Sequence, residues 1–325
     1  MANRAERVRT HGELCASISA LHDDDVMAIF DHGDVRVGWG ASATIEVDGR
    51  PVFAKALPVT DVERDNPGST ANHFGLPVHY QYGVGSAGFG ARREAEAHRI
   101  ATEWVLAGEC EHFPLLYHER AVPLACQTRL RDPGTVDRLV TYWDDDAAIR
   151  GQARAVGEST HAHVLFVEHF PHVLMEWLPA NQDQLGPVVD QGLVIAAFLR
   201  SRGVVHFDLN DSNIVTDGST IYAADFGLWL DPTFDLGADE RDFLARHQHL
   251  DAAEFLASLE WQVPGQEVEL TDGYRAELEP YREVVDEISA VFERLRSGPK
   301  HRGGYDDARI ASALHRVRGR GTRSP

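Results

Sequence analysis

Residues 204–227, VVHFDLNDSNIVTDGSTIYAADFG, bring together side chains that could act on a phosphate. Asp208 ends a His-Phe-Asp triplet, Asn213 follows it by five residues, and Asp225 opens an Asp-Phe-Gly triplet. Phosphoryl transfer from a nucleotide needs one carboxylate that orients a hydroxyl acceptor and takes its proton. It also needs oxygen ligands for the magnesium ion that neutralises charge between the phosphates. Asp208 fits the first role, and Asn213 and Asp225 fit the second.

A short hairpin is predicted between these side chains. The residues from Asn213 to Ala223 are centred on Asp217-Gly218, a dipeptide typical of tight turns between two strands. Such a hairpin would return the chain to its starting point. It would therefore bring Asp208 and Asp225 to one cleft.

The two triplets, with Asn213 between them, resemble the protein-kinase-like superfamily, which includes protein kinases and aminoglycoside-type small-molecule phosphotransferases. Either triplet alone is a weak signal, whereas both in this order are specific. The resemblance implies an α+β, bilobal protein-kinase-like fold with a strand-rich N-lobe, a mainly helical C-lobe, and ATP and Mg²⁺ in the cleft. It also implies that Asp208 is the catalytic base and that Asn213 and Asp225 are the metal ligands.

The same family needs a strand lysine that reaches the α- and β-phosphates. The segment VFAKAL supplies Lys55 on a predicted strand, and the chain holds one other lysine. A helix acid should pair with this lysine and hold it in place. The helix predicted over residues 91–108 carries Glu94 and Glu96. We favour Glu94 as the partner, and Glu96 remains the alternative.

A hinge strand between the lobes is a further feature of the family, and HVLMEWLPAN resembles it. We therefore expect a strand over Val173–Trp177. By this resemblance, Met175 would lie at the back of the adenine pocket. The backbone groups of Glu176 and Leu178 would bond the adenine edge. The alternative is a buried strand that binds no ligand.

Two glycine-rich stretches compete for the loop that covers the phosphates. Gly38 and Gly40 precede the Lys55 strand, in the order that the family requires, and we assign them to this loop. The stretch from Gly83 to Gly88 matches G-x-G-x-x-G, which alone would suggest the dinucleotide-binding turn of an oxidoreductase. Its preceding segment, LPVHYQY, is a poor buried strand. We interpret this second stretch as an inserted loop that could fold over the cleft.

The remaining pattern divides the chain into four regions: an N-terminal helical extension (1–30), an N-lobe with an inserted loop at 58–82 (31–178), a C-lobe (179–298) and a basic tail (299–325). One helix is expected over residues 11–30, and further strands over Phe113–Tyr117 and His163–Val167. An apolar helix is expected over Val188–Leu199. The Gly- and Arg-rich tail predicts a solvated or frayed terminus.

The composition limits the function classes further. The 325 residues include 31 Lys and Arg against 51 Asp and Glu, a formal charge of −20. So acidic a chain argues against non-specific binding to nucleic acid or to an anionic membrane. Scattered Cys15, Cys110 and Cys126, with no signal-peptide pattern, favour a cytoplasmic protein. Paired histidines such as HAH and HQH suggest zinc, but no cysteine or carboxylate is spaced to complete a closed site.

Three departures from the family concern the acceptor. Phe207 replaces an arginine of regulated protein kinases, Asn210 replaces a lysine of Ser/Thr kinases, and no A-P-E element follows Gly227. The hypothesis is an ATP- and Mg²⁺-dependent kinase that transfers the γ-phosphoryl group, an atypical protein or peptide Ser/Thr kinase. Its partner would be a peptide, a protein or a cationic small molecule. The alternatives are an aminoglycoside-like small-molecule phosphotransferase and a nucleotide-binding pseudokinase.

Overall fold

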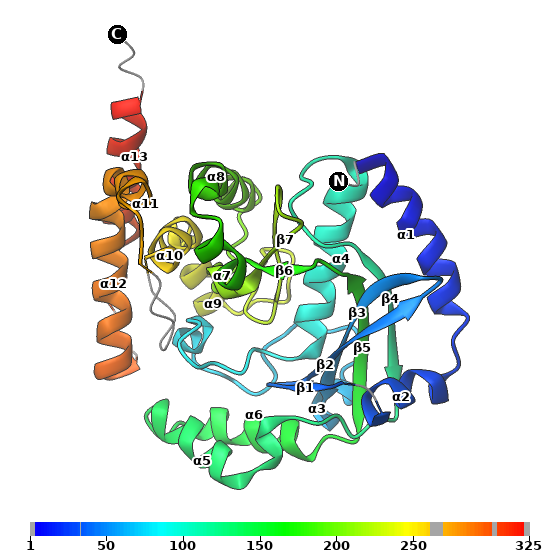
Figure 1. Ribbon diagram of the computed structural model, residues 1–325. Helices are drawn as coiled ribbons and strands as arrows, with labels where there is room; N and C mark the ends of the chain where they lie inside the picture. Colours follow the sequence, from blue (N-terminus) through cyan, green and yellow to red (C-terminus); the bar gives the residue numbers. More distant parts are fainter. Residues whose placement is uncertain (1–3, 33, 261–268, 301–303, 322–325) are drawn as a thin grey trace. The chain divides into compact units, whose positions relative to one another are not determined.

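The chain folds into two compact units, which we call the strand-rich unit and the helical unit. The computed structural model describes residues 4–32, 34–260, 269–300 and 304–321 (Figure 1). The strand-rich unit comprises Met1–Gln81, Gly85–His169 and Phe234–Gly237, and the helical unit comprises Tyr82–Val84, Phe170–Thr233 and Ala238–Pro325. The predicted α+β class, with strands mainly in the first part and helices mainly in the second, is confirmed. Apart from Tyr82–Val84, the chain passes into the helical unit after His169.

The strand-rich unit contains a five-stranded antiparallel sheet in the order β1-β2-β3-β5-β4. Its strands are β1 (Arg36–Val37), β2 (Ala41–Val47), β3 (Arg50–Val59), β4 (Leu116–Val122) and β5 (His161–Glu168). Its helices are α1 (Arg4–Ser19), α2 (Asp23–His32), α3 (Asp61–Asp65), α4 (Ala91–Ala107), α5 (Pro133–Tyr142) and α6 (Ala147–Glu158). The strand predicted over residues 163–167 is part of β5. The one predicted over 113–117 begins only at Leu116.

The hairpin of β2 and β3 positions the strand lysine. Asp48 and Gly49 form its turn with φ angles of 52° and 73°. A two-residue type I′ turn needs this left-handed conformation at both positions, and Asp-Gly is among the pairs that adopt it. Lys55 pairs with Ser42 of β2 on one side and with Leu165 of β5 on the other. The lysine therefore lies on a central strand of the sheet.

Helix α4 packs on this sheet and carries both candidate acids. It begins after Gly90 and ends at Gly108, whose φ of 74° closes the helix in the left-handed conformation. Its contact face is made of small residues. They join a buried cluster of Leu57, Ala91, Ala95, Leu116, Leu165 and Val167. Because alanine adds little bulk, the axis of α4 can lie close to β3.

The N-terminal residues form two helices, α1 and α2, where the sequence predicted one. Buried Arg7 of α1 donates to the Glu168 carboxylate at 2.7 Å and to the Phe113 carbonyl oxygen at 2.7 Å. Burying a guanidinium is costly unless its donors are paired, and here the partners are a carboxylate and backbone oxygens. Arg7 therefore fixes the end of β5.

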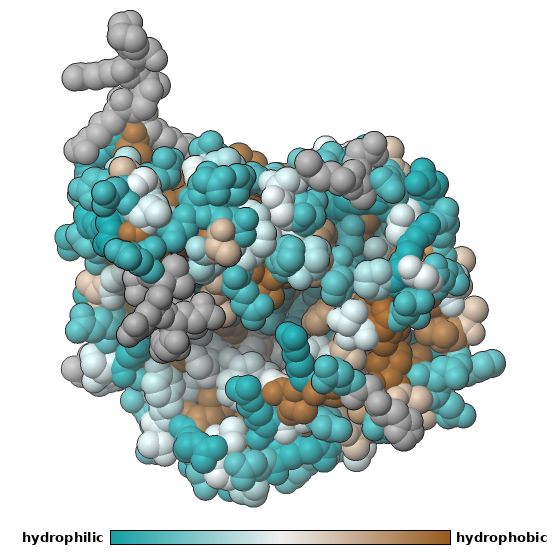
Figure 2. Space-filling view, viewed as in Figure 1, coloured by the Kyte–Doolittle hydropathy of each residue, from teal (hydrophilic) through white to brown (hydrophobic). Residues whose placement is uncertain are grey.

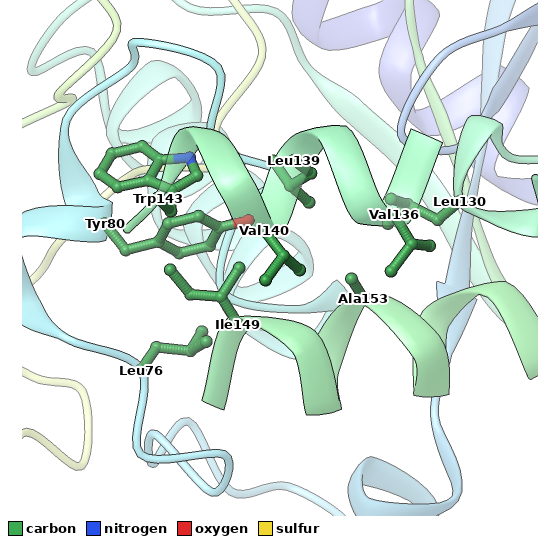
Figure 3. Packing of buried hydrophobic residues seen from close by; sticks show 9 residues of the cluster. All are labelled: Leu76, Tyr80, Leu130, Val136, Leu139, Val140, Trp143, Ile149 and Ala153. Carbon is green, nitrogen blue, oxygen red and sulfur yellow. The ribbon is translucent and has the colours of Figure 1, made fainter. Parts of the chain in front are cut away.

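Helices α5 and α6 form an insertion between β4 and β5. Their facing side chains enclose a buried cluster with two residues of the loop before α4, Leu76 and Tyr80 (Figure 3). The rings of Tyr80 and Trp143 meet edge to face, with centroids 4.8 Å apart. The predicted inserted loop is thus packed against α5 and α6.

The helical unit contains a small antiparallel sheet in the order β6-β7-β8. Its strands are β6 (His172–Val173), β7 (Ile214–Thr216) and β8 (Ile221–Ala223). Its helices are α7 (Leu174–Trp177), α8 (Leu185–Ser201), α9 (Ala238–Ala245), α10 (Leu250–Ser258), α11 (Asp272–Leu278), α12 (Arg282–Ser297) and α13 (Asp307–Gly321). The predicted apolar helix is α8.

Two predictions for this unit are wrong. The strand predicted over Val173–Trp177 is extended only at His172–Val173, because Leu174–Trp177 form helix α7. The tail predicted as solvated or frayed contains helix α13, and its Ile310 and Ala313 are both 2% exposed. Residues 301–303 and 322–325 of that tail lie outside the described residues.

Helix α10 is held against α8 by a close contact. A Cβ atom added at Gly192 of α8 would lie 2.0 Å from the ring of Phe255. Only glycine leaves room for that ring. This contact fixes α10, which carries Asp251 and Glu254.

Polar side chains cover most of the face drawn in Figure 2, in keeping with the many charged residues of the sequence. Of the helices in the described residues, none combines the length and the apolar character needed to cross a membrane.

Candidate active site

The loop from Asp208 to Asn213 is tied together by its own amide side chains. Asn213 donates from Nδ2 to the Asp208 carbonyl oxygen at 3.0 Å, and Asn210 donates from Nδ2 to Asp208 Oδ1 at 2.8 Å. The Asn210 carbonyl oxygen accepts from the backbone N–H of Asn213 at 3.0 Å. The loop therefore fixes both the backbone and the carboxylate of Asp208.

The predicted hairpin brings Asp225 beside this loop. Ile214 of β7 pairs with Ala223 of β8, with Asp217-Gly218 at the turn. One residue further, the backbone N–H of Ala224 donates to the Asn213 carbonyl oxygen at 2.8 Å. Because Asp225 is the next residue, it directly follows a backbone hydrogen bond to Asn213.

Two residues of the segment 204–227 have strained backbones. Phe207 and Asp225 have φ angles of 64° and 60°, in the left-handed region that non-glycine residues rarely adopt. Each such residue costs on the order of 1–3 kcal/mol and persists only where its surroundings enforce it. The fully buried ring of Phe207 stacks on Phe243 with centroids 5.5 Å apart. Phe207, which stands in the place of an arginine, is therefore a core residue.

The group that holds Phe207 is Asp251 of α10, which the sequence did not reveal as a site residue. Its carboxylate accepts from the backbone N–H of His206 at 2.9 Å and from that of Phe207 at 3.1 Å. Burial raises the pKa of Asp251 to about 7, although these hydrogen bonds act in the opposite direction. Asp251 therefore positions the backbone directly before Asp208.

His206 links the two triplets. Its Nε2 lies 3.1 Å from the Ala224 carbonyl oxygen, so a neutral imidazole protonated at Nε2 donates to it. Burial lowers the pKa of His206 to about 4, so the ring is neutral near pH 7. This bond joins the segment before Asp208 to the residue before Asp225.

Glu254, a second buried acid of α10, interacts electrostatically with Asp208. Burial raises its pKa well above the usual value, and the charges of Asp208 and Asp251 act in the same direction. The side chain of Asn210, which bonds Asp208, also bonds Glu254 and opposes this shift. Asn210 thus bridges the two carboxyl groups.

We expect Glu254→Gln to stabilise the protein above about pH 5. In the wild type the folded chain keeps the Glu254 proton while the unfolded chain releases it, so stability falls as pH rises through this window. Glutamine has no such proton. The gain should be absent near pH 4 and grow by up to about 1.4 kcal/mol per pH unit until folded Glu254 ionises.

Urea unfolding at several pH values measures this gain. The matched control is Glu293→Gln on an exposed site of α12, which should change stability little at any pH. A gain from Glu254→Gln that is the same at pH 4 and pH 8 would contradict the burial argument.

In the strand-rich unit, Lys55 pairs with Glu94. Lys55 Nζ lies 2.5 Å from Glu94 Oε1, and the two side chains are 18% and 7% exposed. Glu96, two residues further along α4, pairs instead with Arg92 at 3.3 Å and with Arg99. The alternative left open by the sequence is decided for Glu94.

Gly38 and Gly40 form the turn between β1 and β2. The Gly38 N–H donates to the Gly40 carbonyl oxygen at 2.8 Å. A Cβ atom added at Gly40 would lie 2.4 Å from the Ala56 carbonyl oxygen, so this turn packs directly on the strand of Lys55. The turn of Gly38 and Gly40 therefore lies beside the strand that carries Lys55.

Met175, Glu176 and Leu178 were assigned to the adenine pocket because a hinge strand was predicted there, and the structure does not contain that strand. Met175 and Glu176 belong to α7, and Leu178 follows it, so the three residues do not form a strand. The strand that pairs with the Lys55 strand and leads out of the strand-rich unit is β5.

The structure supports neither a dinucleotide-binding turn at Gly83–Gly88 nor a zinc site in the described residues. The Gly83–Gly88 stretch follows a short 3-10 helix (Val78–Gln81), and the strand pairs of the described sheets are antiparallel, unlike a dinucleotide-binding βαβ unit. Within the described ranges, no group of three or more His, Cys, Asp and Glu side chains could hold a metal ion. The zinc hypothesis therefore has no site there.

Of the comparisons with known proteins, the one with solved structures finds a similarity. No protein-family model matches the sequence, and no curated protein matches it. A solved structure, WaaP in complex with acyl carrier protein, is similar over 91% of this chain and 91% of that chain. The identity is 14% and the TM-score is 0.37. So distant a similarity carries no argument about activity, and the kinase-like interpretation rests on the geometry of the chain itself.

Asn213 and Asp225 suit a magnesium ion. Both offer hard oxygen donors, and Mg²⁺ in proteins commonly takes one or two such ligands while water and phosphate oxygens complete its shell. Because Asn213 Nδ2 donates to Asp208, the amide orientation is fixed. These two residues would hold the ion.

Proposed function

We propose that the chain is an ATP- and Mg²⁺-dependent phosphotransferase that moves the γ-phosphoryl group to a hydroxyl acceptor. The observation that carries this proposal is the array in which Asn213 bonds both the Asp208 backbone and Ala224, next to Asp225. Such an array joins a base and two oxygen ligands on a rigid frame. Preorganised charged groups of this kind are what phosphoryl transfer requires.

In the proposed reaction, each side chain has one task. Asp208 orients the acceptor hydroxyl and takes its proton as the new P–O bond forms and the bond to ADP breaks. Asn210 and Asn213 hold Asp208 in position. Magnesium, when bound, neutralises charge on the phosphates. Asp251 maintains the strained backbone of Phe207 that aims the loop.

On the nucleotide side, Lys55 would bind the α- and β-phosphates while Glu94 keeps its ammonium group in place. The turn of Gly38 and Gly40 would cover the phosphates. For binding the adenine, we assign the backbone at the end of β5 in place of Met175, Glu176 and Leu178.

The acceptor we favour is a serine or threonine hydroxyl of a peptide or protein, with a cationic small molecule as the second candidate. The acidic sequence favours a cationic acceptor in either case. A screen for transfer of labelled γ-phosphate to peptides, proteins and hydroxylated polycations tests this point. Transfer only to small molecules would favour the aminoglycoside-like alternative.

The first test of the nucleotide site is Asp225→Asn. We expect ATP to bind the wild type more tightly with Mg²⁺ than with EDTA, and the variant to lose about 10–100-fold of its Mg²⁺-supported affinity. The reason is that an amide is a weaker ligand than a carboxylate for this hard cation. Calorimetric titration with ATP measures both affinities.

An addition of a nicotinamide cofactor serves as the negative control of this titration. Equal ATP affinity of the wild type with and without Mg²⁺ would contradict the proposed metal ligands. Magnesium-dependent binding without any transfer would instead favour the pseudokinase alternative.

A further inference from the structure

Three residues before helix α4, Tyr82–Val84, belong to the helical unit, whereas the chain on either side belongs to the strand-rich unit. We call them the 82–84 segment. Before it, Tyr80 is fully buried in the cluster of α5 and α6 (Figure 3). After it, Trp143 donates from Nε1 to the Gly85 carbonyl oxygen at 3.4 Å. Packing thus holds the chain at both ends of the segment.

Tyr82 anchors the segment inside the helical unit. His247 Nδ1 lies 2.6 Å from the Phe243 carbonyl oxygen and donates to it, so its Nε2 accepts from the Tyr82 hydroxyl at 2.7 Å. The His247 ring stacks on Tyr305 with centroids 4.5 Å apart. Burial lowers the pKa of His247 to about 4, which keeps this acceptor neutral near pH 7. The segment therefore has a fixed position in this unit.

Gly83 lies directly against the candidate base. A Cβ atom added at Gly83 would be 2.4 Å from Asp208 Oδ1, 3.0 Å from its Cγ and 3.2 Å from the Phe207 carbonyl oxygen. Gly83 does not have a left-handed backbone, so its φ angle does not require glycine. The requirement is space beside the carboxylate.

The same oxygen, Asp208 Oδ1, accepts from Asn210 Nδ2 at 2.8 Å. The carboxylate is therefore confined by a hydrogen bond from its own loop and by the backbone of Gly83. A side chain at residue 83 would have to push the carboxylate or the 82–84 segment away. The first glycine of the G-x-G-x-x-G stretch thus has a role unrelated to a dinucleotide.

We propose that the 82–84 segment positions the carboxylate of Asp208, with Gly83 as a positioning residue that must lack a side chain. This inference rests on the proposed phosphotransferase function. It makes the 82–84 segment part of the structure that surrounds the base.

The first test is Gly83→Ala, with Gly273→Ala as the matched control. Gly273 also lies in the helical unit without a left-handed φ, and its nearest neighbour to an added Cβ is 3.9 Å away. We expect Gly83→Ala to lower kcat for phosphoryl transfer on the order of 100-fold, with KM for ATP unchanged, because small displacements of a reacting group have effects of this size. The control should keep the wild-type kcat. An unchanged kcat in Gly83→Ala overturns the proposal.

A stability cycle tests the contact without any activity. Gly83→Ala should lower Tm by several degrees in the wild type, and by much less in an Asp208→Ala background, where the clashing carboxylate is gone. Equal Tm losses in the two backgrounds would overturn the contact, whatever the activity. If the wild type transfers no phosphoryl group, both the proposed function and the positioning role are overturned. This holds even if the stability cycle confirms the contact between Gly83 and Asp208.

Tyr82→Phe adds no volume and covers the case in which Gly83→Ala does not fold. Loss of the hydroxyl that bonds His247 should loosen the segment and lower kcat about 5–10-fold, again with KM for ATP unchanged. A wild-type kcat in this variant counts against the anchored segment.

Discussion

Replacing Asp208 by asparagine is expected to lower phosphoryl transfer by about 10²–10⁴-fold while leaving ATP binding intact. Asparagine has nearly the same shape, but its amide cannot take the proton of the acceptor hydroxyl. The proposed Mg²⁺ ligands, Asn213 and Asp225, are unchanged, and the backbone bond from Asn213 to residue 208 does not involve the altered side chain. The variant should therefore separate binding from chemistry.

The same substitution should not destabilise the fold. The charge of Asp208 contributes to the raised pKa of buried Glu254, and a neutral residue removes this unfavourable contribution. Functional sites commonly sacrifice stability in this way, so Tm should stay the same or rise. Asp190→Asn on the exposed side of α8 is the matched control and should change neither transfer nor ATP affinity.

Labelled γ-phosphate transfer and calorimetric ATP titration on the same preparations measure both effects. Full transfer by Asp208→Asn would exclude Asp208 as the base. A joint loss of transfer, ATP binding and thermal stability would show a general structural defect instead.

The parts of the site that sequence reasoning could locate are those fixed by local rules. The Asp48-Gly49 and Asp217-Gly218 turns determine two hairpins, because the pair at each turn permits the conformation required. Lys55, Asn213 and Asp225 lie in or next to these hairpins, and their roles were predicted from their chemistry and from the resemblance to the kinase-like superfamily. Local chemistry is enough for such positions.

The error at residues 173–177 has a local cause as well. Leu174, Met175 and Glu176 are good helix formers, and none is β-branched. The resemblance to a hinge strand outweighed this preference in the prediction. In the structure the helical preference holds, and only His172 and Val173 pair with β7.

Asp251 and Gly83 could not be found from the sequence because their roles depend on distant contacts. Asp251 lies on an acidic helix and resembles a solvated residue until α10 docks on Gly192 of α8. Gly83 belongs to a motif with another common meaning, and its contact with Asp208 spans more than a hundred residues of sequence. Such tertiary contacts leave no periodic pattern in the chain.

Replacing Glu94 by glutamine is the second change with a large expected effect. Glutamine keeps the size of the side chain but removes the charge that lies 2.5 Å from Lys55 Nζ. Lys55 is largely buried, so its ammonium group would lose its closest carboxylate in a region with little water. We expect the lysine to leave its position, phosphoryl transfer to fall about 10–100-fold, and stability to fall by about 2 kcal/mol.

Glu96→Gln provides a control on the same helix, two residues away. Glu96 pairs with Arg92 and Arg99, and its side chain is 30% exposed. Pairs this exposed contribute at most about 1 kcal/mol, so Glu96→Gln should leave transfer unchanged and stability nearly so. Transfer rates and urea unfolding of the two variants, measured side by side, give the comparison. Equal transfer by both variants would mean that the Lys55–Glu94 pair supports the fold of the strand-rich unit and has no part in binding phosphate. A selective loss of transfer in Glu94→Gln, larger than its loss of stability explains, would tie that pair to the reaction.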